Sequence, residues 1–104
     1  MTTFDDREKA FESKYAHDEE MKFRAVARRN KLVGLWAAEL LGKTGEAAQA
    51  YAAEVVAADL EEAGDEDVFR KLARDLEGRA DAQTIREQMV ALMAEAKAQV
   101  MKEA

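Results

Sequence analysis

Three glycines divide this chain into helix-length pieces, and they constrain its fold more than any other feature. Gly42, Gly64 and Gly78 each follow a segment with helical periodicity, where a residue in the left-handed region closes a helix. Each is followed within three residues by an N-cap candidate, and these are Thr44, Asp65 and Asp81. The chain has no proline that would end a helix elsewhere. The joints predict four helices, at about residues 18–41, 45–63, 66–77 and 82–102.

Apolar residues recur at the helical period within each predicted helix. The two long stripes are Val26, Val33, Trp36 and Leu40 in the first helix, and Ile85, Met89, Leu92, Ala96 and Val100 in the last. The middle helices offer Ala48, Tyr51, Ala52, Val55 and Val56, then Val68, Phe69, Leu72 and Leu76. Short connections make sequential helices antiparallel neighbours. We therefore predict an all-α four-helix bundle formed by residues 18–104, in which the alanine-rich second helix allows close backbone approach.

Composition and charge exclude several classes of partner. Hydrophobic residues make up 48% of the chain, but 22 are alanine, so the larger apolar side chains fill one small core. The absence of cysteine excludes disulfides and thiolate metal sites, and it suits a cytoplasmic protein. With 22 acidic and 16 basic residues, the net charge of −6 repels phosphodiester backbones, so we expect no nucleic-acid partner. No apolar run is long enough for membrane insertion, and the N-terminus lacks a signal-peptide pattern.

Searches for catalytic and metal motifs fail on particular residues. Gly42-Lys43-Thr44 resembles the end of a P-loop, but Ala37 stands where the first glycine is needed. Asp59 begins a run like a calcium loop, in which Arg70 replaces the essential bidentate carboxylate. A single histidine, His17, is too few for a di-iron bundle. Because no nucleophile, base and orienting group come together, we expect no metal site, no required cofactor and no enzymatic activity.

Two runs of like charge stand out. The basic run comprises Lys22, Arg24, Arg28, Arg29 and Lys31, and the acidic run comprises Glu54, Asp59, Glu61, Glu62, Asp65, Glu66 and Asp67. One interpretation is that the two runs face solvent or each other. The other is a nucleotide site, because arginines beside an aromatic ring hold phosphate and stack on a base. Its residues would be Arg24, Arg28, Arg29, Lys31 and Trp36, although Trp36 also suits a core position.

Residues 1–17, here called the N-terminal arm, differ from the rest of the chain. Phe4, Phe11 and Tyr15 lie at helical intervals of seven and four, but they are three large apolar groups among many charges. Such a segment is flexible or partly helical, because a short helix without packing is marginal in water. Two interpretations fit: the arm is the start of the first helix and docks on the bundle, or it becomes ordered in a partner's groove.

Several stretches carry a resemblance to a known family. They are residues 4–12, 16–21, 27–32, 34–38 and 62–69, together with Val55, Val56 and Asp59. The chain is similar, over essentially its full length, to the zeta subunit family, the alphaproteobacterial inhibitors of F-type ATP synthase. In the N-terminal stretch the departures are Ser13 and Tyr15, which keep size and period. These long stretches make the resemblance specific.

The resemblance implies a regulatory inhibitor of ATP hydrolysis rather than an enzyme. It implies a protein that is cytoplasmic, monomeric when free, and peripheral to the inner-membrane synthase. Its partner would be the catalytic head, with α, β and possibly γ subunits in contact, and ADP or ATP would be a regulatory ligand of the bundle. The arm would insert as a helix at a catalytic α/β interface. Carried onto this chain, the apolar anchors would be Phe4, Phe11 and Tyr15, and the polar face Asp5, Asp6, Arg7, Glu8, Lys9 and Lys14.

Some questions stay open at this stage. His17 lies at the junction of arm and bundle, and it is either a pH-sensitive hinge or a solvent-exposed spectator. Two other function classes fit the residues without the resemblance. One is a helical nucleotide sensor or adaptor with no role at the synthase. The other is a small structural protein whose long helical faces pair with a second copy.

Overall fold

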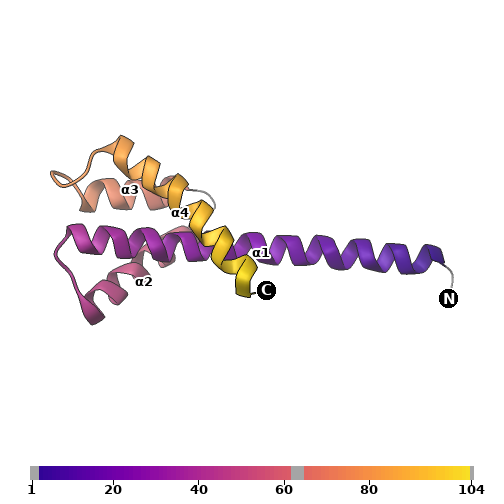
Figure 1. The fold of residues 1–104 in the computed structure, drawn as a ribbon. Coiled ribbons are helices and arrows are strands. Elements are labelled where there is room, and N and C mark those ends of the chain that lie inside the picture. Colours follow the sequence, from indigo (N-terminus) through magenta and orange to yellow (C-terminus); the bar gives the residue numbers. More distant parts are fainter. Residues whose placement is uncertain (1–2, 62–64, 104) are drawn as a thin grey trace.

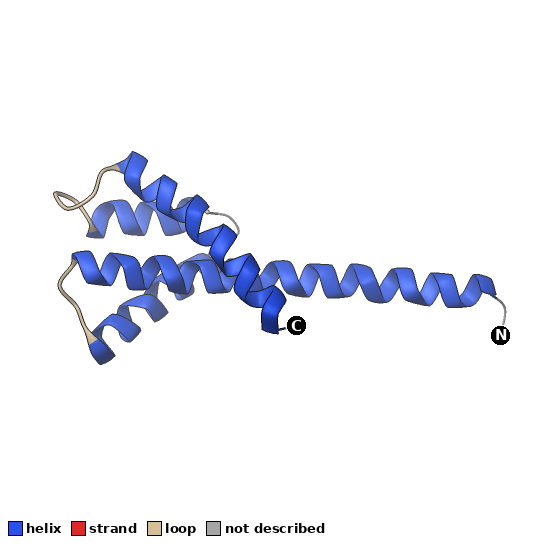
Figure 2. Ribbon diagram, viewed as in Figure 1, coloured by secondary structure: helices blue, strands red, loops and turns tan. Residues whose placement is uncertain are grey.

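The computed structural model describes residues 3–61 and 65–103, and the side chains of residues 19–59 and 65–103. Within these residues the chain forms four helices, and all regular structure is helical (Figure 2). The helices are α1 (Thr3–Leu40), α2 (Gly45–Glu61), α3 (Glu66–Asp75) and α4 (Ala82–Glu103). This confirms the all-α four-helix prediction, with boundaries for α2 to α4 that lie within about two residues of those expected.

Helix α1 departs most from the expected boundaries. It begins at Thr3, so its backbone has no break near residue 18, where we expected the first bundle helix to start. Figure 1 shows its first part running beyond the other helices, away from the C-terminus of α4. A helix of 38 residues spans about 57 Å, which accounts for most of the molecule's 62 Å longest dimension. The helical spacing of Phe4, Phe11 and Tyr15 allowed this continuation as one of two interpretations, but the sequence alone did not decide between them.

Glycine ends α1 in the way the sequence predicts. Gly42 has a φ of 76°, and its N–H donates to the Glu39 carbonyl at 3.1 Å. The Lys43 N–H reaches back to the Ala38 carbonyl at 2.9 Å, which completes a Schellman motif. Gly42 is therefore a helix cap and not part of a phosphate loop. Gly78 also has a positive φ, of 80°, whereas Gly64 lies outside the described residues.

The N-cap predictions have two different outcomes. Asp81 caps α4, because its Oδ1 accepts a hydrogen bond from the Thr84 N–H at 2.8 Å. Hydrogen bonding to the Thr84 side chain, and then to this N–H, lowers the pKa of the Asp81 carboxyl. Asp65 occupies the N-cap position of α3, but its side chain makes no capping hydrogen bond. Its carboxylate instead accepts a hydrogen bond from Arg29 of α1.

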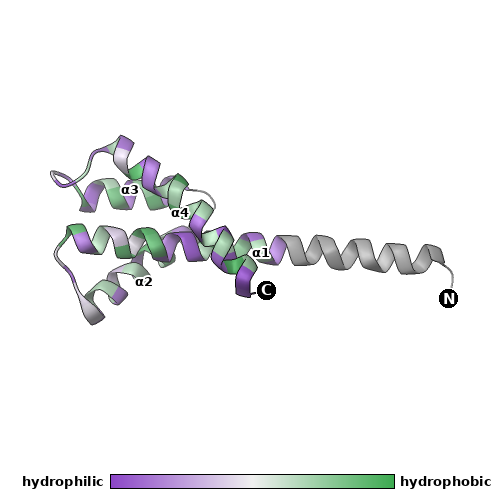
Figure 3. Ribbon diagram, in the orientation of Figure 1, coloured by the Kyte–Doolittle hydropathy of each residue, from purple (hydrophilic) through white to green (hydrophobic). Residues whose placement is uncertain are grey.

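The core lies among all four helices, and most of it was predicted from the apolar spacing. Helix α1 packs against both α2 and α4, and α3 packs against α2 and α4. The buried cluster comprises Val33, Ala37, Ala38, Tyr51, Val55, Val68, Leu72, Leu76, Ile85 and Met89. Trp36 packs against this cluster and is partly buried, as its core interpretation required. Figure 3 shows hydrophobic and hydrophilic residues alternating along α3 and α4, as expected for helices with one buried face.

Helices α1 and α2 approach closely at Gly34. A Cβ added to Gly34 would lie 2.8 Å from the Ala52 Cα and 3.3 Å from the Val55 Cβ. The nearest of these atoms is backbone, so no side-chain rotation can relieve the contact. The alanine-rich face of α2 thus allows the close approach that we predicted, and glycine on α1 is its counterpart.

Candidate functional site

The arm residues predicted to bind a partner lie on the exposed end of α1. They are Phe4, Asp5, Asp6, Arg7, Glu8, Lys9, Phe11, Lys14 and Tyr15, and the helix backbone includes all of them. Their side chains, and that of His17, lie outside the described residues. The backbone therefore continues the arm as an extension of a helix whose later turns are packed in the bundle (Figure 1).

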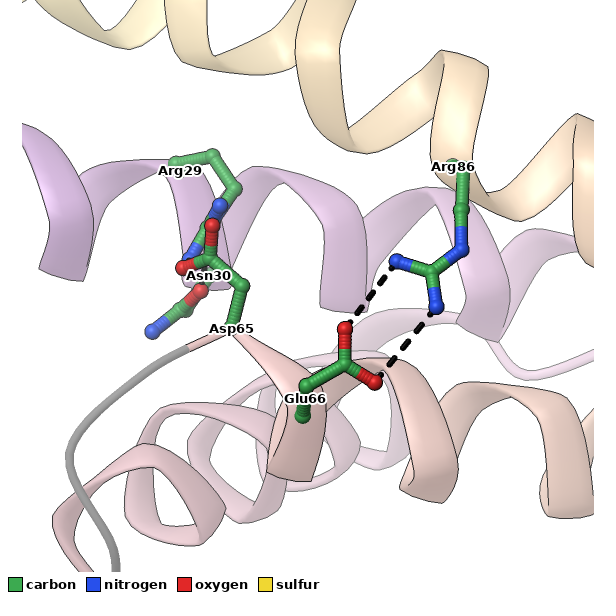
Figure 4. A network of polar contacts seen from close by, with 5 residues as sticks. All are labelled: Arg29, Asn30, Asp65, Glu66 and Arg86. Carbon is green, nitrogen blue, oxygen red and sulfur yellow. Dashed lines mark hydrogen bonds and ion pairs between the residues drawn. The ribbon is translucent and has the colours of Figure 1, made fainter.

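A polar cluster, buried at Arg29 and Asn30 and exposed at Asp65, connects α1 to the start of α3 (Figure 4). Arg29 is only 2% exposed, and its Nη2 donates to the Asp65 Oδ1 at 2.8 Å. Its Nε donates to the Asn30 Oδ1 at 2.7 Å. The hydrogen bond from Arg29 lowers the pKa of the Asp65 carboxyl despite partial burial. The basic and acidic runs of the sequence thus meet through this ion pair, in agreement with the interpretation that they face each other.

Asn30 is the least satisfied member of this cluster. It is 1% exposed, and its Nδ2 has no hydrogen-bond partner in the part of the chain that the structure describes. Asn30 also lines a hollow of about 250 Å³ between α1 and α2, beside the 69% exposed Phe23. A buried amide is favourable only when it has an acceptor, so the position of Asn30 depends on the polar groups around this hollow.

A second cavity, here called the α1–α4 cavity, is lined by Arg29. Its volume is about 490 Å³, which is in the range of small-molecule sites. Its apolar residues come from α4 and are Met89, Val90, Met93 and Ala94. Its charged residues are Arg29, Asp65, Arg86 and Lys97. The cavity therefore combines an apolar floor with three cations and one carboxylate.

Arg86 ties α4 to α3 at the edge of this cavity. Its guanidinium faces the Glu66 carboxylate, with Nη1 and Nη2 at 3.3 and 3.4 Å from the two oxygens (Figure 4). The same guanidinium lies 3.8 Å from the centre of the Phe69 ring. Arg86 and Lys97 were not predicted as site residues, since no local pattern distinguishes them from other exposed basic residues on a helix.

The residues of the nucleotide hypothesis do not converge on one place. Arg24, Arg28 and Lys31 line one depression, of about 460 Å³, together with Val56 and Glu103. Arg29 points to the α1–α4 cavity, and Trp36 packs against the core. The arrangement of arginines beside an aromatic ring that the sequence suggested is therefore not assembled in this structure.

Arg28 is the most firmly held cation of that depression. It donates to the Gln99 Oε1 at 2.8 Å and forms an ion pair with Glu103 at 2.8 Å, which joins α1 to the end of α4. The hydrogen bond with Arg28 lowers the pKa of the Glu103 carboxyl. Arg24 pairs with Glu20 one turn earlier on α1, and both side chains are more than half exposed.

The described residues contain neither a candidate membrane span nor a candidate metal site. In residues 3–61 and 65–103, no helix has an apolar stretch of the length needed to span a bilayer. Among the side chains of residues 19–59 and 65–103, no three acidic or histidine groups lie together so that they could hold a metal ion.

Four packed helices, one of which extends past the others, define a small all-α helical protein. The chain belongs to the family of the ATPase inhibitor subunit zeta, whose family model matches residues 1–99. The chain is therefore a regulatory protein of the ATP synthase, as the resemblance implied.

A comparison with solved structures gives a similar fold. The chain is similar to a protein whose solution structure was determined by NMR, with 60% sequence identity and a TM-score of 0.74. The match covers 81% of this chain and 99% of the other. A search of the curated proteins gave no match.

Proposed function

We propose that this protein inhibits ATP hydrolysis by inserting its N-terminal arm as a helix at a catalytic α/β interface of the F-type ATP synthase head. The observation that carries the proposal is the course of α1, which runs without a break from Thr3 to Leu40 and extends beyond the bundle (Figure 1). The bundle supplies the rigid base, and the arm supplies the inhibitory surface. In this proposal the protein acts as a monomer that associates peripherally with the synthase.

The mechanism requires no chemistry from the inhibitor. A helix that fits one geometry of the interface and clashes with the next stops the rotary cycle, because it binds those states with different affinities. An isolated helix of about 12 to 15 residues is marginal in water because its nucleus is costly. The packed turns of α1 provide that nucleus, so the arm loses less conformational freedom when it docks.

Substitutions on opposite sides of the arm test this function. Phe4, Phe11 and Tyr15 share one side of a helix, and Ser13 lies on the other. We expect Phe11→Ala to raise the half-inhibitory concentration by about 30-fold or more, since truncating a buried aromatic anchor costs about 2 kcal/mol or more. Ser13→Ala is the matched control and should inhibit like the parent chain. Equal effects of the two substitutions would argue against a specific apolar face.

We further propose that ADP or ATP binds to the bundle in the α1–α4 cavity. The apolar residues that line this cavity suit a base, and the exposed cations Arg86 and Lys97 suit phosphate oxygens. Arg29 and Arg86 already pair with Asp65 and Glu66, so phosphates must compete with carboxylates. We therefore expect modest affinity.

An ADP titration followed by amide chemical shifts tests the location. Binding in the α1–α4 cavity should shift the amides of residues 89–97 and should weaken when Lys97 is replaced by glutamine. Lys31→Gln, which removes an exposed cation from the other depression, is the matched control. Shifts confined to residues 24–28, with sensitivity to Lys31→Gln, would instead assign the nucleotide to that depression.

A further inference from the structure

Three cations form a stripe on one face of α1, close to where the helix leaves the bundle. Arg24, Arg28 and Lys31 are spaced by four and three residues, and they line the same depression. Arg24 and Lys31 are exposed, and Arg28 is partly exposed. We call these three residues the basic stripe. Arg29, the neighbour in sequence, turns into the interior and does not belong to it.

The basic stripe contrasts with the charge of the remaining chain. Residues 22–31 carry five basic and no acidic side chains. The other 94 residues carry 22 acidic and 11 basic side chains, a net charge of −11. An acidic partner would repel most of this molecule and attract this one segment. Such a charge distribution orients a protein during association more than it adds to the final affinity.

The ion pair between Arg24 and Glu20 leaves the charge of Arg24 available to a partner. Arg24 and Glu20 are 54% and 57% exposed, and an exposed pair of this kind contributes little free energy. A carboxylate of a partner can therefore replace Glu20 at low cost. Arg28 donates from its two Nη atoms to Gln99 and Glu103, so its charge is paired within the chain, and Arg24 and Lys31 are the exposed cations of the stripe.

The position of the stripe relates it to the arm. Arg24 follows Tyr15 by nine residues, which is about 14 Å along a helix. When the arm lies in a cleft, the stripe is at the mouth of that cleft. We propose that the basic stripe docks on an acidic protein surface at the rim of the cleft that receives the arm, and that it steers the arm into the cleft. This inference rests on the proposed inhibitory function.

Two charge-reversed variants with the same net charge test the proposal. The first is Arg24→Glu with Lys31→Glu, which reverses the two exposed members of the stripe. The matched control is Lys43→Glu with Arg70→Glu, which reverses two exposed cations outside the stripe, in the α1–α2 connection and on α3. Each variant and the parent chain are measured for association rate with immobilised F-type ATP synthase, at about 50 mM and about 300 mM NaCl. Thermal unfolding of each variant verifies that the bundle is folded, and Arg24→Gln with Lys31→Gln replaces the first variant if it is not.

We expect the stripe variant to associate at least about tenfold more slowly than the parent chain at low salt, and to lose most of the salt dependence. The control should stay within about threefold of the parent chain. Equal slowing by both variants would show an effect of net charge alone, and an unchanged rate of the stripe variant would show no role for the stripe; either result overturns the proposal. Stripe-dependent binding of the parent chain to vesicles with anionic lipids, without an effect on synthase association, would also overturn it in favour of a membrane surface. Failure of the inhibitory function is read separately, as association without inhibition of ATP hydrolysis.

Discussion

The guanidinium of Arg29 lies inside the bundle, 2.8 Å from the carboxylate of Asp65, but the two side chains differ greatly in exposure: 2% for Arg29 and 61% for Asp65. The carboxylate can be solvated without its partner, whereas the guanidinium cannot. The contact also links α1 to the start of α3, although Arg29 and Asp65 are 36 residues apart in sequence. This difference in exposure leads to an asymmetric prediction for the two partners.

Asp65→Ala is expected to destabilise the bundle more than Arg29→Met. The first change leaves a buried charge without its counter-ion, which costs about 3 kcal/mol or more. The second leaves Asp65 in water and removes one donor from the Asn30 Oδ1, which costs about 1 to 2 kcal/mol. Urea denaturation followed by circular dichroism measures both. A larger loss for Arg29→Met would mean that packing of the arginine stem outweighs its charge.

Gly34→Ala is expected to destabilise the protein, although alanine is the better helix former. The added Cβ would meet the Ala52 Cα at 2.8 Å, so α1 and α2 must separate. Overpacking of this kind costs about 1 to 3 kcal/mol, which exceeds the gain of about 1 kcal/mol in helix propensity. Thermal unfolding should show a lower midpoint.

A second substitution separates backbone from side-chain contact at this position. Because the nearest atom is backbone, adding Ala52→Gly to Gly34→Ala should not restore stability. Recovery in the double variant would indicate that the Cβ of Ala52 was the obstacle.

The sequence predicted those features of the fold that depend on residues close together in the chain. The caps at Gly42 and Asp81, and core residues such as Leu72 and Ile85, follow from helical period and turn chemistry, which depend on neighbours in the chain. The continuation of α1 through residue 18 was one of two interpretations, and the few apolar residues of that segment did not decide between them.

The candidate site was less accessible to sequence reasoning. The five residues of the nucleotide hypothesis were grouped because they lie within thirteen consecutive positions of one helix, 24–36, but a helix directs such residues to different sides. Arg29 therefore turned inward while Arg28 turned to the end of α4. The partners of these residues, Asp65 and Gln99, depend on how the helices cross. No spacing within one helix contains that information.

Acid should destabilise the bundle partly through Asp75. Burial raises the pKa of this carboxyl, but hydrogen bonds from Lys71 and the Tyr51 hydroxyl outweigh it and hold the pKa below 3.8. The ionised form thus stabilises the fold above pH 3.8, and this contribution disappears as the pH falls through the native pKa. Asp75→Asn should flatten the acid side of a stability profile, whereas Glu39→Gln, on an exposed face of α1, should leave its shape unchanged.

Inhibition by the His17→Ala variant between about pH 6 and about pH 8 tests the hinge hypothesis. A pH-sensitive hinge predicts that the parent chain changes in inhibitory strength across this range and that the variant does not. Parallel behaviour of the two chains would identify His17 as a spectator.

Insertion of the N-terminal arm is tested most directly by ATP hydrolysis of purified F-type ATP synthase in the presence of the full chain or of a chain that lacks residues 1–14. The buried core residues of the described structure lie between Ala25 and Val100, so the shortened chain should keep its cooperative thermal unfolding. We expect the full chain to inhibit hydrolysis and the shortened chain to leave it at the uninhibited rate. Full inhibition by the folded, shortened chain would contradict the mechanism.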